Sequence, residues 1–283
     1  MVTVKERVWS ATLSIGGYSM LNLSGKTAFV FGVASEDSIA WAICKMLAES
    51  GVNLYLGYQK RFRSRIFQLK DKLPQIAGFY PLDVATDEDT KEFFDAFSKE
   101  NPGKKADIMI HAIGFAPRTC FDRPILFVED QDINTAMTIS ANSLQRCLKF
   151  ALPHLNPNSS TITLTYAASN RFVPSYGIMS MAKAALECWT RELACHLGPE
   201  GHRVNAISSG PIRTIAASGI PGFDNILDHV EKNAPLRRNV SQDDVAGATL
   251  WLASPLSGGV TGQCIYVDAG YSITMVPETI MNN

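Results

Sequence analysis

Short apolar segments rich in β-branched and aromatic residues alternate with helix-length segments from residue 27 to near the end of the chain. Most of these short segments are apolar on both faces, which is typical of strands covered by helices on either side. The alternation therefore predicts a doubly wound, mostly parallel α/β sheet of about seven strands with helices on both faces. The expected strands are Thr27–Gly32, Asn53–Tyr58, Gly78–Leu82, Asp107–His111, Thr161–Tyr166, Arg203–Ser208 and Gln263–Val267.

Capping signals mark several of the intervening helices. The pattern Ser38–Ser50 is followed by Gly51, where helices commonly end in a left-handed residue. A Ser or Thr three residues before Asp predicts helix starts ahead of Lys91–Lys99 and Val245–Ala253. No repeat, low-complexity tract or linker divides the chain, so residues 20–283 are expected to form one Rossmann-type domain.

The composition describes a globular protein. Of 283 residues, 46% are hydrophobic and 19% charged, and the formal net charge of -1 does not favour nucleic-acid binding. No apolar stretch is long enough to span a bilayer. Six cysteines without a Cys-x-x-Cys pair argue against a metal site or a disulfide framework and favour the cytoplasm. They are Cys44, Cys120, Cys147, Cys188, Cys195 and Cys264.

Residues 1–19 stand apart from this pattern. Polar residues interrupt their apolar patches, so they do not read as a secretory signal. We expect a disordered extension or a start codon assigned too far upstream, with a functional arm as the alternative.

Tyr176 and Lys183 are the first candidates for chemistry. If Tyr176 opens a helix, a residue seven positions later lies ~10.5 Å along the axis and ~20° away in angle. The phenol and the ammonium then reach into one cleft, where Tyr can donate to an oxygen that gains charge and Lys can hold a sugar hydroxyl.

The end of the first strand has features of a nucleotide site. Gly32 permits a tight turn, and the amides around Ser38 and Ile39 would face a pyrophosphate at a helix N-terminus. The loop is not Gly-x-Gly-x-x-Gly, so a purely structural turn is the alternative.

The next two strand ends leave the choice between NADH and NADPH open. Gln59 could bond the ribose, and Lys60 or Arg63 could meet a 2′-phosphate, but a solvated basic helix start explains them equally well. Asp83, followed by Val84, suits the adenine edge, with an N-terminal cap of the next helix as the alternative.

The fourth strand ends in His111-Ala112-Ile113-Gly114. Gly114 would let the backbone approach the ribose of the cofactor. His111 is interpreted as a packed histidine rather than a catalyst.

Together these segments resemble the enoyl-acyl-carrier-protein reductases of bacterial fatty-acid synthesis, a branch of the short-chain dehydrogenase/reductase superfamily. The resemblance covers about residues 20–273. It is carried by the loop from Gly32, the segment His111-Ala-Ile-Gly-Phe-Ala-Pro, the tract from Arg203 to Ile220, Val260-Thr-Gly-Gln, and Tyr166 with Tyr176 and Lys183. Tyr and Lys lie seven apart, whereas the generic superfamily spacing is four, a slot that Ser180 occupies here.

The resemblance implies NADH- or NADPH-dependent reduction of trans-2-enoyl thioesters carried by acyl carrier protein, in a homotetramer. Tyr176 would donate to the thioester oxygen, Lys183 would hold the nicotinamide ribose, and Tyr166 would lie beside the acyl group. A carbonyl reductase of the same superfamily and a non-catalytic dinucleotide sensor are the alternatives.

The resemblance also implies two sets of binding residues. Further cofactor contacts are expected at Ala112, Ile113, Gly114, Pro211, Ile212 and Thr214. The substrate is expected to contact Phe115, Ala116, Tyr166, Tyr176, Met179, Ala216, Ile220, Phe223 and Ile226. The last four belong to an expected mobile lid over residues 211–232, with an ordinary core-facing helix as the alternative.

This chain departs from the family in the lid and in the last strand. Family members often carry Lys or Arg in the lid, which suits an acidic carrier, whereas this lid holds Pro221, Asp224, Asn225 and Asp228. Either carrier docking is shifted or the acyl donor differs. Ala269 stands where Gly is frequent, and we expect it to be tolerated.

Overall fold

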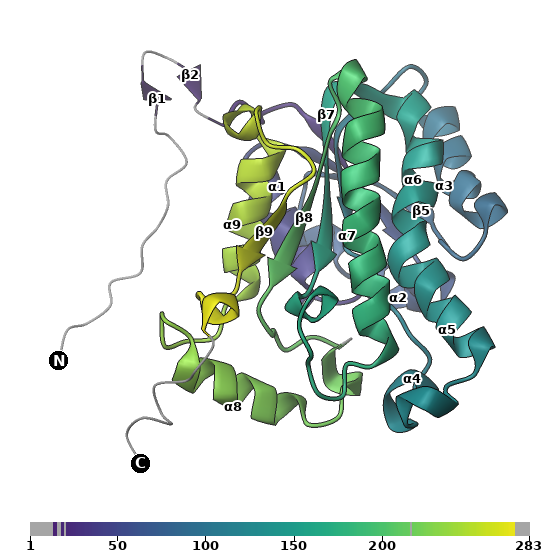
Figure 1. Cartoon of the computed structure of the whole chain (residues 1–283). Coiled ribbons are helices and arrows are strands. Elements are labelled where there is room, and N and C mark those ends of the chain that lie inside the picture. Colours follow the sequence, from purple (N-terminus) through teal and green to yellow (C-terminus); the bar gives the residue numbers. More distant parts are fainter. Residues whose placement is uncertain (1–13, 16–17, 20, 216, 275–283) are drawn as a thin grey trace.

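A computed structural model describes residues 14–15, 18–19, 21–215 and 217–274 (Figure 1). Within these residues the central sheet has seven strands in the order β5-β4-β3-β6-β7-β8-β9, and every neighbouring pair is parallel. The expected fold class is confirmed. The strands are β3 (Thr27–Phe31), β4 (Asn53–Tyr58), β5 (Ile76–Pro81), β6 (Ala106–His111), β7 (Leu155–Thr165), β8 (Arg203–Ser209) and β9 (Cys264–Val267).

Helices cover both faces of this sheet (Figure 1). They are α1 (Ile39–Glu49), α2 (Arg63–Phe67), α3 (Asp87–Glu100), α4 (Thr119–Asp122), α5 (Asp130–Met137), α6 (Ser143–Ala151), α7 (Ile178–Leu197), α8 (Phe223–Asn233) and α9 (Gln242–Ala253). A π-helical turn, Thr138–Asn142, joins α5 to α6. Short 3-10 turns occupy Lys60–Phe62, Lys70–Lys72, Ile125–Phe127, Leu152–His154, Ala167–Ser169, Gly198–Glu200, Ala217–Gly219, Pro255–Ser257 and Tyr271–Ile273.

The predicted capping signals set the helix ends. The Ser38 hydroxyl accepts from the amide of Trp41 at 3.2 Å, and Gly51 has a φ of +82° after the last turn of α1. Thr86 caps α3 with its side chain. Ser241 and Asp244 form a reciprocal capping box at α9. Local side-chain chemistry thus fixes these boundaries.

Strand boundaries differ more from the prediction. β7 begins at Leu155, six residues before the expected start, because Leu155 pairs with Ala106 across an irregularity in the ladder. β5 begins at Ile76, because its first residue pairs with Leu54 before a register shift. Pairing partners decide these starts, and they are not adjacent in sequence.

Two cores lie on opposite faces of the sheet. The face under α1 and α9 is mainly aliphatic. The other face, under α3, α6 and α7, is built on phenylalanine rings in edge-to-face contact, such as Phe29 and Phe97 at 4.8 Å between centroids. These cores hold the strands whose carboxyl ends carry the candidate site.

The switch point of the sheet lies between β3 and β6, because the chain runs outward from β3 to β4 and β5 and then returns to β6. Ligands of doubly wound sheets bind in the crevice at such a point. Gly32 follows β3 there with a φ of +100°, and a Cβ at this position would overlap the carbonyl oxygen of Ala112 after β6. Only glycine fits this approach.

The N-terminal segment is described only in part. Ser14–Ile15 (β1) and Tyr18–Ser19 (β2) pair as a small antiparallel ladder. The rest of the expected disordered extension, residues 1–13 and 16–17, lies outside the described residues. No helix in the described part of the chain combines the length and apolar character that a membrane crossing requires.

Ala269 adopts a φ of +58° and is buried. The fold therefore places an alanine in backbone that favours glycine, which costs on the order of 1 kcal/mol. The family's frequent glycine at this position has a conformational reason here.

We predict that Gly32→Ala destabilises the fold far more than Gly25→Ala. Both positions have positive φ, but nothing lies within 4 Å of a Cβ at Gly25. Gly25→Ala should therefore cost about 1 kcal/mol of backbone strain, and Gly32→Ala more than about 3 kcal/mol. Urea unfolding at one protein concentration measures both, and equal losses would contradict the close approach.

Candidate active site

Tyr176 does not open a helix, so the predicted helical offset between Tyr176 and Lys183 is wrong in detail. α7 begins at Ile178, after Gly177 with φ +50° and ψ −129°. Ser175 is also left-handed, at φ +63°, and a Cβ on Gly177 would lie 2.7 Å from the carbonyl oxygen of Cys120. A tight, glycine-dependent turn therefore presents Tyr176, and α7 presents Lys183.

Lys183 is buried, with 7% of its surface exposed. Its Nζ donates to the carbonyl oxygen of Leu164 at 2.9 Å. A Cβ at Gly114 would lie 3.6 Å from Nζ, so the ammonium faces the loop after β6. Burial lowers the pKa of Lys183 from 10.5 to about 8.

The two tyrosines lie against each other. The rings of Tyr166 and Tyr176 are 5.0 Å apart between centroids, at 59°. Burial raises the pKa of Tyr166 to about 12, and burial with the neighbouring Tyr166 raises the pKa of Tyr176 further above its usual value. Both phenols therefore keep their protons at neutral pH and can act as hydrogen-bond donors.

An apolar cluster surrounds Tyr176. Its buried members include Met179, and partly buried Ala116, Tyr166 and Ile220 pack against it. These five residues, all predicted substrate contacts, are brought together although they come from four separate segments. Such a surface suits a hydrocarbon chain beside two phenols.

The remaining predicted substrate residues are placed differently. Phe115 is exposed beside this site, and Phe223 is half-buried at the start of α8. Ile226 packs against the aliphatic core, which supports the core-facing alternative at that residue. Ala216 lies outside the described residues.

Sequence analysis missed Ser140, which lies in the π-helical turn. Its hydroxyl donates to the carbonyl oxygen of Phe115 at 2.7 Å, accepts from the amide of Phe115 at 2.8 Å, and lies 3.6 Å from the sulfur of Met179. It therefore fixes two predicted site residues. No pattern in residues 138–142 signals a π-turn, although such turns often mark functional sites.

The dinucleotide loop combines a glycine cradle with an unpaired polar atom. The buried Ser35 hydroxyl has no hydrogen-bond partner, which fits a site that expects a polar ligand. The amide of Ser38, which was predicted to face a pyrophosphate, already donates to the carbonyl oxygen of Ser35 at 3.2 Å, and the Ser38 hydroxyl caps α1. Ile39 is half-buried at the first position of α1.

The basic segment after β4 is already engaged. Lys60 pairs with Glu92 at 3.3 Å, and the oxygen of Gln59 accepts from Arg61 at 2.9 Å. The guanidinium of Arg63 lies 5.4 Å from the ring of Phe67. A basic helix start with its own partners is therefore the simpler interpretation of Lys60 and Arg63.

Asp83 and Val84 follow β5. The Asp83 carboxylate accepts from the amide of Ala85 at 3.0 Å, and the cap of α3 is Thr86, so the helix-cap alternative for Asp83 is wrong. Asp83 stays exposed, as an adenine contact requires. The Val84 side chain is buried in the aromatic core, and its carbonyl oxygen accepts from Arg146.

His111 is fully buried, as interpreted from the sequence. Its ring nitrogens lie 2.9 Å from the hydroxyls of Thr163 and Ser143. Burial lowers its pKa to about 3, so it stays neutral. The adjoining Ala112 and Ile113 are half-buried and lead to Gly114.

The loop after β8 closes the same edge of the sheet. Pro211 and Ile212 are buried, and the Thr214 hydroxyl accepts from the amide of Ala217 at 3.1 Å. The amide nitrogen of Gln242 donates to the carbonyl oxygens of Asp37, at 3.1 Å, and Arg213, at 3.4 Å. This side chain, which sequence analysis missed, joins the two loops expected to hold the cofactor.

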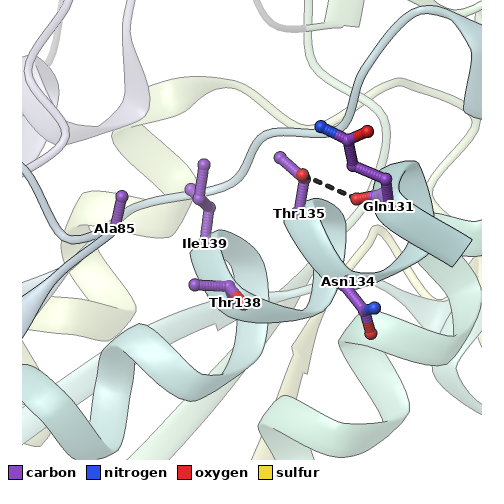
Figure 2. A pocket seen from close by; sticks show the side chains of 6 residues that line it. All are labelled: Ala85, Gln131, Asn134, Thr135, Thr138 and Ile139. Carbon is purple, nitrogen blue, oxygen red and sulfur yellow. Dashed lines mark hydrogen bonds between the residues drawn. The ribbon is translucent and has the colours of Figure 1, made fainter.

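An open pocket of about 490 Å³ is lined by neither Tyr166 nor Tyr176, and Figure 2 shows the side chains that line it. Ala85 is next to Val84, and the other lining residues come from α5 and the π-helical turn. They are Gln131, Asn134, Thr135, Thr138 and Ile139. The hydroxyl of Thr135 donates to the carbonyl oxygen of Gln131 at 2.8 Å, within α5.

The family model for enoyl-(acyl carrier protein) reductase matches residues 32–272. This chain belongs to the enoyl-(acyl carrier protein) reductase family. It is 43% identical over 267 residues to the enoyl-[acyl-carrier-protein] reductase [NADH] FabI of Haemophilus influenzae, which covers 90% of this chain and 97% of the relative. The corresponding Synechocystis enzyme is 41% identical and covers 90% of this chain and 99% of the relative.

Solved structures of this family agree. The Bacillus cereus reductase, crystallised with NADP+ and indole naphthyridinone, has a TM-score of 0.86 and 38% identity, covering 90% of this chain and 99% of that chain. The Anaplasma phagocytophilum reductase, in complex with NAD, has a TM-score of 0.85 and 35% identity, covering 90% and 97%. The expected resemblance is confirmed.

Within the expected lid, residues 211–232, the structure has a short turn, Ala217–Gly219, and the larger part of α8. An exposed ion pair links α8 to the start of the same segment, with Arg213 and Asp224 at 2.5 Å. Asp224 is one of the residues that depart from the family's basic lid. Its carboxylate is therefore already paired with a cation from this chain.

We predict that Lys183 makes stability rise with pH. In the folded chain it loses its proton near pH 8, whereas an ordinary lysine holds it until about 10.5, so the unfolded chain binds more protons in between. The unfolding free energy of wild type minus that of Lys183→Met should therefore grow from about pH 8 toward pH 10.

Urea unfolding across this range measures the difference, and Lys99→Met, an exposed lysine on α3, is the matched control. A flat difference for Lys183→Met would contradict burial of the ammonium.

Proposed function

We propose that this protein reduces the trans-2 double bond of enoyl thioesters carried by acyl carrier protein, in fatty-acid elongation. The proposal rests on the contact between the two protonated phenols of Tyr166 and Tyr176, with the buried Lys183 ammonium bonded to Leu164 two residues before Tyr166, in a chain of the reductase family. A dinucleotide sensor has no need for the paired phenols.

The residues divide the work as follows. When bound, the nicotinamide would supply hydride to the β-carbon of the substrate, and a proton added at the α-carbon would complete the reduction. Tyr176 donates a hydrogen bond to the thioester oxygen, where negative charge develops, and its raised pKa keeps the proton available. Lys183 holds the ribose hydroxyls, and Tyr166 packs beside the acyl group. The apolar cluster with Met179 excludes water from the reacting end.

We propose NADH as the cofactor. Two of the similar relatives are named for NADH, and the Lys60 ammonium next to the expected ribose is already paired with Glu92. A 2′-phosphate would have to compete with that carboxylate. Gly32, the unpaired Ser35 hydroxyl and the loop from Pro211 fit the dinucleotide.

The carrier-bound substrate would enter under the lid, residues 211–232, with Ile220 on its inner face. We propose a cytoplasmic location, where acyl carrier protein and reduced cofactor are available. The six cysteines, all within the described residues, are free thiols, which suits a reducing compartment.

We also propose a homotetramer in which α6 and α7, the helices before and after Tyr166, pair between subunits, as the resemblance implies. Light scattering should give a mass near four times 30.9 kDa. A stable monomer would contradict this arrangement.

The test of the reaction is the decay of reduced-cofactor fluorescence with two thioesters. Crotonyl thioester should be reduced with NADH, faster than with NADPH, and acetoacetyl thioester should not. Turnover of acetoacetyl thioester alone would make the protein a carbonyl reductase. Binding of NADH without turnover of either thioester would favour the sensor.

We predict that Tyr176→Phe lowers turnover about 100- to 1,000-fold while NADH affinity stays nearly unchanged. The variant keeps the ring but removes the donor, and such donors are worth roughly 2.7–4 kcal/mol. Tyr58→Phe, a buried tyrosine in β4 outside the site, serves as control. Equal turnover in Tyr176→Phe and wild type would remove the assigned role.

A further inference from the structure

Glu187 lies on α7 four residues after Lys183 and has no part in the reaction described so far. Its carboxylate accepts from the hydroxyl of Thr165 at 2.8 Å. Thr165 is buried and is the last residue of β7, directly before Tyr166. Glu187 therefore ties the helix that carries the lysine to the strand end that carries a tyrosine.

A second bond joins the same two elements. Lys183 donates to the carbonyl oxygen of Leu164, the neighbour of Thr165 in β7. Two successive turns of α7 thus hold two successive residues of the strand. This pair of bonds fixes how far α7 can slide along β7, and so fixes Lys183 relative to Tyr166.

The protonation of Lys183 depends on the Glu187 carboxylate, because the other titratable groups nearby carry no negative charge at pH 7. Among the described residues, His111 on β6 interacts electrostatically with Lys183, and Cys264 on β9 is hydrogen-bonded to Glu187 and lies near Arg191 on α7. The phenols of Tyr166, after β7, and Tyr176, in the turn before α7, are the other titratable groups at this end of the two elements. Burial lowers the pKa of His111 to about 3 and raises that of Cys264 to about 12, so both are neutral at pH 7.

The phenols are neutral for the same reason, so the imidazole, the thiol and the phenols contribute no anion. Glu187 is the charged group that opposes the effect of burial on the pKa of Lys183. A buried ammonium with one neutral acceptor is costly, and a nearby carboxylate lowers that cost.

We propose that Glu187 is a positioning residue that keeps Lys183 charged and aligned with the end of β7 for cofactor binding. The inference rests on the proposed function, because holding the ribose is the task assigned to Lys183. It adds a residue that touches neither cofactor nor substrate in that scheme. Because the Glu187 carboxylate acts by keeping Lys183 protonated, its removal should weaken NADH binding in a pH-dependent way.

The test is the dissociation constant of NADH between about pH 6 and 9, by fluorescence titration. In wild type, affinity should fall as pH rises through about 8, where Lys183 loses its proton. In Glu187→Gln, which keeps an oxygen for Thr165 but removes the charge, the fall should start at lower pH. At about pH 8 the variant should bind roughly tenfold more weakly, and at about pH 6 within about twofold of wild type.

Three variants separate charge from structure. Glu187→Asp restores the charge and should move the profile back toward wild type. Thr165→Val removes the hydrogen bond but keeps the carboxylate, and should leave the midpoint pH in place. Glu192→Gln, an exposed glutamate on the same helix, should have no effect. A loss of affinity in Glu187→Gln that is equal at every pH, or no loss, would overturn the proposal.

A second measurement needs no cofactor. In the Glu187→Gln background, the unfolding free energy relative to Glu187→Gln/Lys183→Met should begin to rise with pH below about 8, earlier than in the wild-type background. Identical pH ranges in the two backgrounds would refute the role of Glu187. Failure of wild type to bind NADH at any pH would refute the proposed function instead. The unfolding measurement would still test whether Glu187 keeps Lys183 protonated.

Discussion

The structure of the site depends on one buried contact, the Lys183 ammonium against the carbonyl oxygen of Leu164. A charge in an apolar interior is unfavourable unless it has partners, and this one has a single hydrogen bond and a carboxylate one helical turn away. The contact joins α7 to β7 and leaves the ammonium with donors to spare on the side of Gly114. A ligand with hydroxyl oxygens would satisfy them.

The turn before α7 places the phenol with equal strictness. Ser175 and Gly177, both with positive φ, flank Tyr176 on either side, and the glycine lies against the backbone of Cys120. Such backbone is maintained only where surrounding packing holds it, and it often occurs at functional sites. The phenol of Tyr176 therefore lies beside Tyr166 because a costly turn directs it there.

At the nucleotide end of the site, unlike at Lys183 and Tyr176, the backbone rather than the side chains determines the shape. Gly32 lets β3 and β6 approach at the switch point, and Gln242 joins the loops after β3 and β8 from a third segment. The cations after β4 pair with their own neighbours. The shape of the crevice thus comes from the sheet topology, and its charge is largely balanced within the chain.

The sequence by itself determined the alternation of elements, the caps at Ser38, Thr86 and Ser241, and the identity of Tyr166, Tyr176 and Lys183, because these depend on local patterns and family motifs. Only the tertiary structure decided where α7 begins, which residues face Tyr176, and that Ser140 and Glu187 support the site. Contacts between residues distant in sequence depend on strand order and packing, which no local pattern encodes.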